Sequence, residues 1–329
     1  MELMLGIETS CDDTSVALVD RAGRVAAIET VSQFEIHAPH GGVYPELASR
    51  AHLEAILPAT RAALDRAGIA PRDLAGIGVT RGPGLIGSLL VGLSTAQALA
   101  LAWDTPLYGV NHLRGHIRSV DLEEARLRHP ALLLLVSGGH TLLAHLPDPW
   151  TVRLMGTTRD DSVGESYDKV ARLLGLGMPG GPEIDRRAKA GEAVIRFPRP
   201  MIREGYEFSF SGLKSSVARH LETHPDAAIN DVAASFVASC LDVLAAKCAR
   251  AIDEVNPAAL AVVGGVAASP QLRARMAGIT DAAGVELCLP PLRWSTDNAA
   301  MIALAAWDYA DRGLRPDLQP KPNLGVETP

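Results

Sequence analysis

The sequence predicts an α/β protein built from two similar lobes. Two segments carry this prediction, because each reads as an apolar strand, a short turn of glycine and hydroxyl residues, and a second apolar strand; they are residues 3–20 and 131–146. Clustered backbone N–H groups in such turns form concave sites that suit phosphate. Two phosphate-binding hairpins in one chain favour two related lobes that act on one nucleotide.

Each hairpin opens the same order of elements. The first half predicts strands at 3–9, 15–20 and 24–30, a helix at 45–68, a strand at 77–80, an apolar helix at 84–103 and a strand near 107–110. The second half predicts strands at 131–137, 141–146 and 151–155, a helical insert at about 162–220, a helix at about 229–254, a strand at 259–263, a helix from about 270, a strand near 286–289 and a helix at 298–311.

Duplicated βββαβαβα units resemble the actin/hexokinase/Hsp70-like (ASKHA) two-lobe fold, which has a central nucleotide and metal cleft. We expect a first lobe of residues 1–118 plus about 300–329, and a second lobe of residues 119–299. An ordinary doubly wound α/β protein, whose glycine turns only end strands, is the alternative at this point.

Composition narrows the class of protein. The chain of 329 residues is 47% hydrophobic and 21% charged, which predicts a large core and little disorder. Its net charge of −7 argues against a general nucleic-acid coating protein, although a local basic patch stays compatible with RNA binding. Six cations between Asp185 and Glu204 form such a window, for which a solvated face is the alternative reading.

The cysteines and the most apolar segment indicate a cytoplasmic protein without a membrane span. No CxxC occurs, which argues against a zinc ribbon, and the four scattered cysteines are expected in the core of a protein from a reducing cytoplasm. The start of the chain does not resemble a signal peptide. Residues 84–103 contain Ser88, Ser94 and Gln97, and we interpret them as a buried helix.

Two histidines point to a metal site. His112 and His116 stand four residues apart, and on a helix they share one face at a spacing that suits joint metal ligation. Asp297, at a loop-to-helix junction, offers a third ligand, and two histidines with one carboxylate are compatible with Fe(II), Zn(II) or Mn(II). Leu113 stands where a zinc peptidase carries glutamate, which disfavours that class. A pair of surface or capped histidines is the alternative.

Further polar segments mark a ligand site. Residues 160–168 hold four acids before an apolar helix, partly for N-capping, and Glu165 and Asp168 lie one turn apart, where they can face a ligand hydroxyl. Residues 178–182 predict a rigid turn that exposes backbone, and Asp185 follows. The glycine pair at 264–265 precedes a helix whose N-terminus favours anionic groups.

Nine segments, in order along almost the whole chain, are very similar to the TsaD/Gcp family of tRNA threonylcarbamoyladenosine transferases. They are IETSCDDTSVAL (7–18), HGGVYPELASRAH (40–52), GPGLIGSLLVG (82–92), NHLRGH (111–116), LLVSGGHT (134–141), VGESYDKVARLLGL (163–176), PGGP (179–182), FSFSGLK (208–214) and STDNAAMIA (295–303).

The resemblance implies an activity and a set of site residues. The activity is transfer of a threonylcarbamoyl group from threonylcarbamoyl-AMP to the N6 amine of the adenosine 3′ of the anticodon, in tRNAs reading ANN codons, with release of AMP. The family's metal ligands match His112, His116 and Asp297, for one divalent metal per chain, with Fe(II) expected first and Zn(II) or Mn(II) as alternatives. Its nucleotide-site residues match Leu135, Val136, Ser137, Gly138, Gly139, Asp168, Gly181 and Asp185, and Ser269 stands where the family has asparagine.

The resemblance also implies partners: tRNA, a TsaB-like paralogue and a TsaE-like ATPase. We expect helix 45–66 to face the paralogue and the window 186–203 to contact tRNA. Asp12 and Asp13 are candidates to deprotonate the amine or to orient a water, and the Ser137–Gly139 loop is expected to donate N–H groups. Rival hypotheses are an ASKHA-fold small-molecule kinase, a metallopeptidase and a non-catalytic TsaB-like scaffold.

Overall fold

The computed structural model describes residues 2–40, 42–124, 126–177 and 179–329. Gly41 and Met178, which belong to two of the sequence motifs, therefore lie outside the described residues. The chain divides into two compact units, residues 1–126 with 296–329 and residues 127–295. The first unit extends beyond 118 because the segment Ser119–Glu124 packs against helices of that unit.

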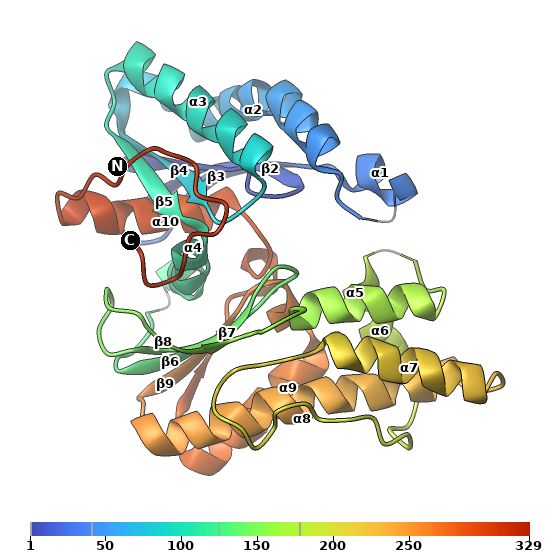
Figure 1. Cartoon of the computed structure of the whole chain (residues 1–329). Coiled ribbons are helices and arrows are strands. Elements are labelled where there is room, and N and C mark those ends of the chain that lie inside the picture. The colour runs from blue at the N-terminus through green and yellow to red at the C-terminus, as the bar shows by residue number, and fades with distance from the viewer. Residues whose placement is uncertain (1, 41, 125, 178) are drawn as a thin grey trace. The chain divides into compact units, whose positions relative to one another are not determined.

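The first unit is a five-stranded sheet with helices on both faces (Figure 1). The strand order is β3-β2-β1-β4-β5, in which β1 and β2 are antiparallel while β1, β4 and β5 are parallel. The strands are β1 (Leu3–Glu8), β2 (Asp13–Asp20), β3 (Val25–Ser32), β4 (Leu74–Gly82) and β5 (Leu107–Asn111). The helices are α1 (Phe34–His37), α2 (Pro45–Ala67), α3 (Ile86–Trp103), α4 (His112–Arg118) and α10 (Ala299–Asp311).

Helix α10 lies close against the central strand. All six residues of β1 are buried, as expected for a strand covered on both faces. A side-chain carbon at Gly6 would overlap the backbone of Ala299, and one at Gly78 would meet Ala306, so both glycines are needed for this approach. Ser15 Oγ accepts a hydrogen bond of 3.0 Å from Ala299 N. The residues that precede α10, Asp297 among them, are thereby placed against the sheet.

The second unit repeats the first. Its sheet has the order β10-β9-β6-β7-β8, so each strand takes the place of its counterpart in the first sheet. Helices α8 and α9 cover one face, and the core lies between α8 and the buried strands (Figure 1). The strands are β6 (Ala131–Val136), β7 (Thr141–Leu146), β8 (Arg153–Thr157), β9 (Ala259–Val263) and β10 (Glu286–Cys288). The helices are α5 (Val163–Leu173), α6 (Gly180–Lys189), α7 (Ser211–Thr223), α8 (Ile229–Val255) and α9 (Pro270–Ala283).

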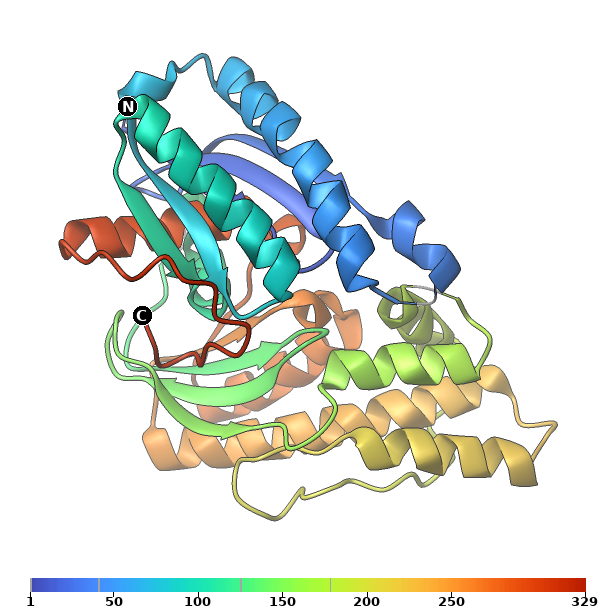
Figure 2. The ribbon, with the colours of Figure 1, turned by 45° about the horizontal axis from the view of Figure 1, so that its top comes forward.

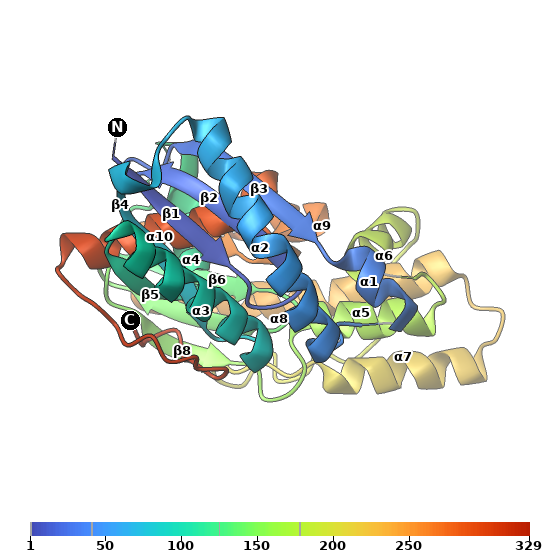
Figure 3. The same ribbon diagram turned by 90° about the horizontal axis from the view of Figure 1, so that it is seen from above.

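The repeated strand order confirms the predicted duplication, and one detail is corrected. The apolar segment 84–103 forms a helix, α3, but only 28% of it is buried, against 78% of the apolar window of α8. Figure 3 shows that α3 lies beside α2 on the outside of the sheet, which it contacts through one face. Both α3 and α8 are long and apolar enough to cross a membrane, but the core helices of soluble proteins also meet this criterion of length and composition.

The cysteines follow the prediction in part. Cys240 and Cys248 are buried in α8, whereas Cys11 and Cys288 are only partly covered.

Candidate functional site

The three predicted metal ligands come together in the first unit. His112 and His116 lie on α4, whose N-cap Asn111 accepts a hydrogen bond of 2.9 Å from Leu113 N. The ligand atoms of His112, His116 and Asp297 all lie within 4.8 Å of one another. Oδ1 of Asp297 is 3.5 Å from Nε2 of His112 and 3.1 Å from Nε2 of His116.

The donor set fits a divalent metal. His116 is fully buried, and neither of its ring nitrogens has a partner with hydrogen-bond geometry among the described residues. A buried polar atom without a hydrogen-bond partner lowers the stability of the fold, so we expect a ligand for one of the two ring nitrogens of His116. Two imidazole nitrogens and one carboxylate oxygen suit Fe(II), Zn(II) and Mn(II).

Electrostatics keep the carboxylate ionised. Burial alone would raise the pKa of Asp297, but the charges of His112 and His116 hold it well below its usual range. Burial would likewise lower the pKa of His112, while Asp297 and Glu8 raise it well above its usual value. Asp297 is therefore an anion that is ready to bind a cation.

Glu8 is a site residue that the sequence reasoning missed. It is buried at the end of β1, with Oε2 at 2.9 Å from Nδ1 of His112 and 2.6 Å from the hydroxyl of Thr80, which donates to it. Ser10 N donates to Oε1 at 2.5 Å. A carboxylate on one imidazole nitrogen leaves the other free for a metal and orients the ring. A charged residue at the end of an otherwise apolar strand was the available signal.

The catalytic candidates Asp12 and Asp13 lie where β2 begins. Burial raises the pKa of Asp13 to about 6; a hydrogen bond with Ser32 opposes this rise, and the nearby carboxylates, first that of Asp12, add to it. His52 of α2 contacts this turn, since its Nε2 is 3.0 Å from the carbonyl oxygen of Cys11. A carboxyl with a pKa near 6 is a competent general base at neutral pH.

In the second unit the Ser-Gly-Gly turn is held from both sides. Ser137 N donates to His140 O at 2.8 Å, and Ser137 Oγ accepts from His140 N at 3.0 Å. Ser162, the N-cap of α5, donates to Gly138 O at 2.5 Å. No described atom would lie within 4 Å of a side-chain carbon at Gly138 or Gly139, so the turn is open on that side. Leu135 and Val136 are buried in β6.

The remaining nucleotide candidates join α5, α6 and α9. Asp168 Oδ1 accepts from Gly180 N at 3.0 Å, and Gly181 lies in the first turn of α6. The described part of the expected turn at 178–182 is thus a helix start, because Pro179 is the N-cap and Pro182 fits the first helical turn. Burial raises the pKa of Asp185, and a hydrogen bond with Ser269 opposes this rise. Oδ1 of Asp185 is buried without a hydrogen-bond partner among the described residues.

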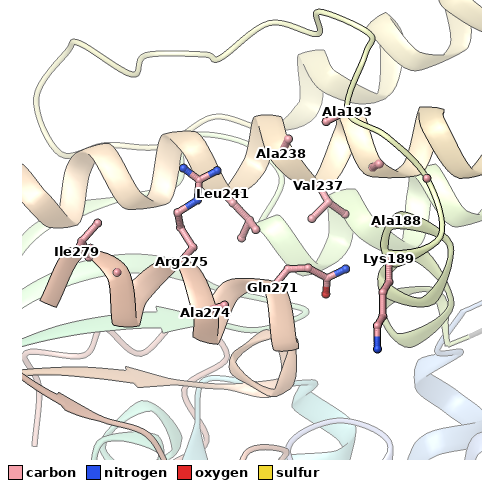
Figure 4. Close-up of a pocket in the computed structure, with 13 residues that line it drawn as sticks. Ala188, Lys189, Ala193, Val237, Ala238, Leu241, Gln271, Ala274, Arg275 and Ile279 are labelled. Carbon is pink, nitrogen blue, oxygen red and sulfur yellow. The ribbon is translucent and has the colours of Figure 1, made fainter. Parts of the chain in front are cut away.

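A groove of about 570 Å³ adjoins these residues on α6, α8 and α9 (Figure 4). Gln271, which lines it, donates from Nε2 to Asp185 O at 2.9 Å. Small side chains make most of the lining, and Figure 4 shows Lys189, Gln271 and Arg275 as its longer polar members. Arg275 is paired with Asp242 at 2.9 Å.

Only some of the cations in the basic window 186–203 are free of ion pairs with the acidic residues that the structure describes. Arg186 and Arg187 both pair with Glu183, and Arg199 pairs with Asp242 at 3.0 Å. Lys189, Arg196 and Arg203 form no ion pair within the part of the chain that the structure describes. The cations available to a phosphate backbone are thus mainly these three.

Comparisons with known proteins point in one direction. The family model for TsaD, tRNA N6-adenosine threonylcarbamoyltransferase, matches residues 24–304. Proteins of that name from Kosmotoga olearia and Salinibacter ruber are 46% and 48% identical to the chain, and each alignment covers at least 92% of both proteins. Among solved structures, T.kodakarensis HypF shares the fold with a TM-score of 0.67 at 14% identity, over 95% of this chain and 48% of that one.

Proposed function

The chain belongs to the TsaD family of tRNA N6-adenosine threonylcarbamoyltransferases, and from this premise we propose how its residues serve the reaction. The enzyme transfers a threonylcarbamoyl group from threonylcarbamoyl-AMP to the N6 amine of the adenosine 3′ of the anticodon in tRNAs reading ANN codons, and AMP leaves. Neither a small-molecule kinase nor a metallopeptidase is favoured by its relatives. The single observation that carries the site is the convergence of His112, His116 and Asp297.

His112, His116 and Asp297 hold one divalent metal, Fe(II) first, with Zn(II) or Mn(II) as alternatives. When bound, this metal supplies positive charge that draws electron density from a phosphate or carbamoyl oxygen. Glu8 keeps a proton on Nδ1 of His112, so that Nε2, which lies beside Asp297, is the nitrogen left for the metal. The lack of a hydrogen-bond partner for either ring nitrogen of His116 among the described residues supports the same assignment.

The second unit holds the adenylate. Gly138 and Gly139 donate backbone N–H groups to phosphate, as the open turn allows, and the first turn of α6 adds Gly181. Asp185 accepts a ribose hydroxyl through its unpartnered Oδ1. Ser269, the N-cap of α9, accepts a bond from Leu272 N and shares a side-chain hydrogen bond with Asp185, so its hydroxyl is less available to a ligand than the family's asparagine amide. Asp168 acts indirectly by holding α6 against α5.

The adenine ring lies in the mouth of the groove beside Asp185. The groove has the size of a small-ligand pocket, and its small side chains leave room for a planar ring. The proximity of Gln271 to Asp185 supports this placement.

Asp13 is the general base that takes a proton from the adenosine amine, and Asp12 assists or orients a water. The raised pKa of Asp13 supports the role, because a weakly acidic carboxyl is a stronger base than an ordinary one. The amine is a poor nucleophile, so positioning and charge stabilisation supply the rest of the rate.

An exposed apolar surface on α2 and α3 receives the TsaB-like paralogue. Leu53 and Leu57 of α2 are 66% and 56% exposed, and Ile86 and Leu90 of α3 are 50% and 46% exposed. Exposed apolar residues grouped on neighbouring helices are typical of protein interaction sites, and α2 and α3 are in contact. A TsaE-like ATPase completes the set, and the assembly works in the cytoplasm without a membrane.

Lys189, Arg196 and Arg203 contribute to the tRNA surface. Reversal of Arg196 and Arg203 to glutamate weakens tRNA binding and flattens its salt dependence, since each lost phosphate contact reduces the salt slope by about one. The pair Arg186→Glu and Arg187→Glu is the matched control, with a smaller expected effect because Glu183 already binds both arginines.

A reconstituted transfer tests the proposal as a whole. The protein and its partners are mixed with threonylcarbamoyl-AMP and an unmodified tRNA reading ANN codons, and the digested nucleosides are weighed by mass spectrometry. Threonylcarbamoyladenosine is expected, and it is lost together with bound metal in the His116→Ala protein. Full activity of a His116→Ala protein that contains no metal would refute the metal assignment.

A further inference from the structure

A C-terminal segment of the first unit crosses the ends of β4 and β5 (Figure 2). Lys321 N donates to Arg81 O at 2.7 Å, and the buried guanidinium of Arg81 pairs with Asp317 at 3.0 Å. A side-chain carbon at Gly82 would overlap the carbonyl of Lys321, so the segment lies directly on the strand. The segment is therefore a packed part of the unit rather than a loose tail.

The last part of this segment, residues 325–328, binds the metal-site helix α4. Nδ2 of Asn111 donates to the carbonyl oxygens of Gly325 and Thr328, each at 2.8 Å. Oδ1 of the same side chain accepts from Leu113 N and caps α4. Arg114, one turn along α4, donates to the carbonyls of Glu327 at 3.2 Å and Thr328 at 3.3 Å.

Helix α4 depends on such contacts for its orientation. It has seven residues, far fewer than an isolated helix needs to be stable in water, and Gly115 at its centre lowers its propensity further. On one side Gly115 packs closely against Ile302 and Met301 of α10. Residues 325–328 hold the helix through Asn111 and Arg114, and Val326 anchors them because it is only 3% exposed.

We propose that residues 325–328 are a strap that positions α4 for metal binding, with Asn111 and Arg114 as the positioning residues. The inference rests on the proposed metal site. His112 follows Asn111 directly and His116 lies one turn further, so a shift of α4 moves both ligands relative to Asp297. The bonds named here from Asn111 and Arg114 end on main-chain carbonyls, so they depend on the backbone path of residues 325–328 and not on the side chains of those residues.

The Asn111→Ser protein separates the two roles of Asn111, which caps α4 and also binds residues 325–328. Serine is an equally good N-cap acceptor for Leu113 N, but it has no amide to donate to Gly325 and Thr328. Loss of an outer contact that orients a metal ligand typically weakens metal binding by roughly 10–100-fold, and we expect an effect in this range. The measurement is the Zn(II) dissociation constant by competition with a chromogenic chelator, with the full-length chain. Thr328→Ala is the matched control, since its exposed side chain takes no part while its carbonyl remains.

Two further proteins make the test decisive. A chain that ends at Leu324 should lose at least as much Zn(II) affinity as Asn111→Ser, because it also removes the bonds of Arg114 to residues 327 and 328. Asn111→Ser should cause no further loss in the shortened chain, because the contact that it removes is already absent there. If either protein fails to fold, Arg114→Met replaces it in the Zn(II) measurement, because this change removes two strap bonds and leaves the N-cap of α4 intact. Unchanged Zn(II) affinity in folded Asn111→Ser and in the shortened chain would overturn the strap. If the unaltered protein bound no Zn(II), the proposed metal site would fail, and the strap with it.

Discussion

Replacing Glu8 by glutamine tests how the metal site is prepared for its ion. Ser10 N can only donate, so the amide oxygen of the new side chain must take the place of Oε1, and the amide nitrogen then faces Thr80 and His112. The Thr80 hydroxyl can rotate to accept, but Nδ1 of His112 can accept only if its proton moves to Nε2. Since Nε2 faces Asp297, the proton then occupies the position that a metal needs.

The expected loss is roughly 10–100-fold in metal affinity, or about 1.4–2.8 kcal/mol. The assay is Zn(II) competition with a chelator, followed by the transfer rate at saturating metal. Thr80→Val is the matched control, because it removes one bond to Glu8 and leaves the contact between Glu8 and His112 intact. Equal Zn(II) affinity in Glu8→Gln and in the unaltered protein, while His116→Ala binds none, would refute this account of the His112 ring.

Three other predictions concern stability, pH and nucleotide binding. Lys247→Met should destabilise the protein by about 3 kcal/mol in urea unfolding, because the buried ammonium donates to the carbonyls of Met201, Glu204 and Gly205. Burial lowers the pKa of Lys247 to about 8, so above pH 8 the unfolded chain binds more protons than the folded one. The stability of the unaltered protein relative to Lys247→Met should therefore rise between about pH 8 and the ordinary pKa of lysine. A stability difference that does not change with pH would contradict this. The transfer rate should rise as pH passes through about 6 and then level off, since Asp13 must be deprotonated; Asp12→Asn should keep this limb and Asp13→Asn should lose it together with most of the rate. Ala274→Phe fills the groove and should weaken AMP binding by about tenfold in calorimetry, whereas Ala282→Phe, exposed on the same helix outside the groove, should not; equal effects would place the base elsewhere.

The sequence by itself determined the repeated order of elements and predicted the candidate metal ligands. Both depend on short-range patterns: continuous apolar runs define β1 and β2, and the spacing of His112 and His116 places them on one face of α4. The position of Asp297 at the start of a helix was likewise predictable, because the N-cap asparagine that follows it is a local sequence signal. The motifs shared with the family then joined these local patterns to an activity.

Only the tertiary structure decided which distant side chains meet. Parallel pairing of Ile7 with Val79 places Glu8 beside Thr80, and the path of β5 into α4 brings His112 to Glu8; no local pattern encodes that register. Packing likewise decided that α3 is covered on one face, because burial depends on what lies against a helix and not on its own hydropathy. The contact between Asn111 and residues 325–328 joins positions more than two hundred residues apart, so it exists only once the sheet has formed.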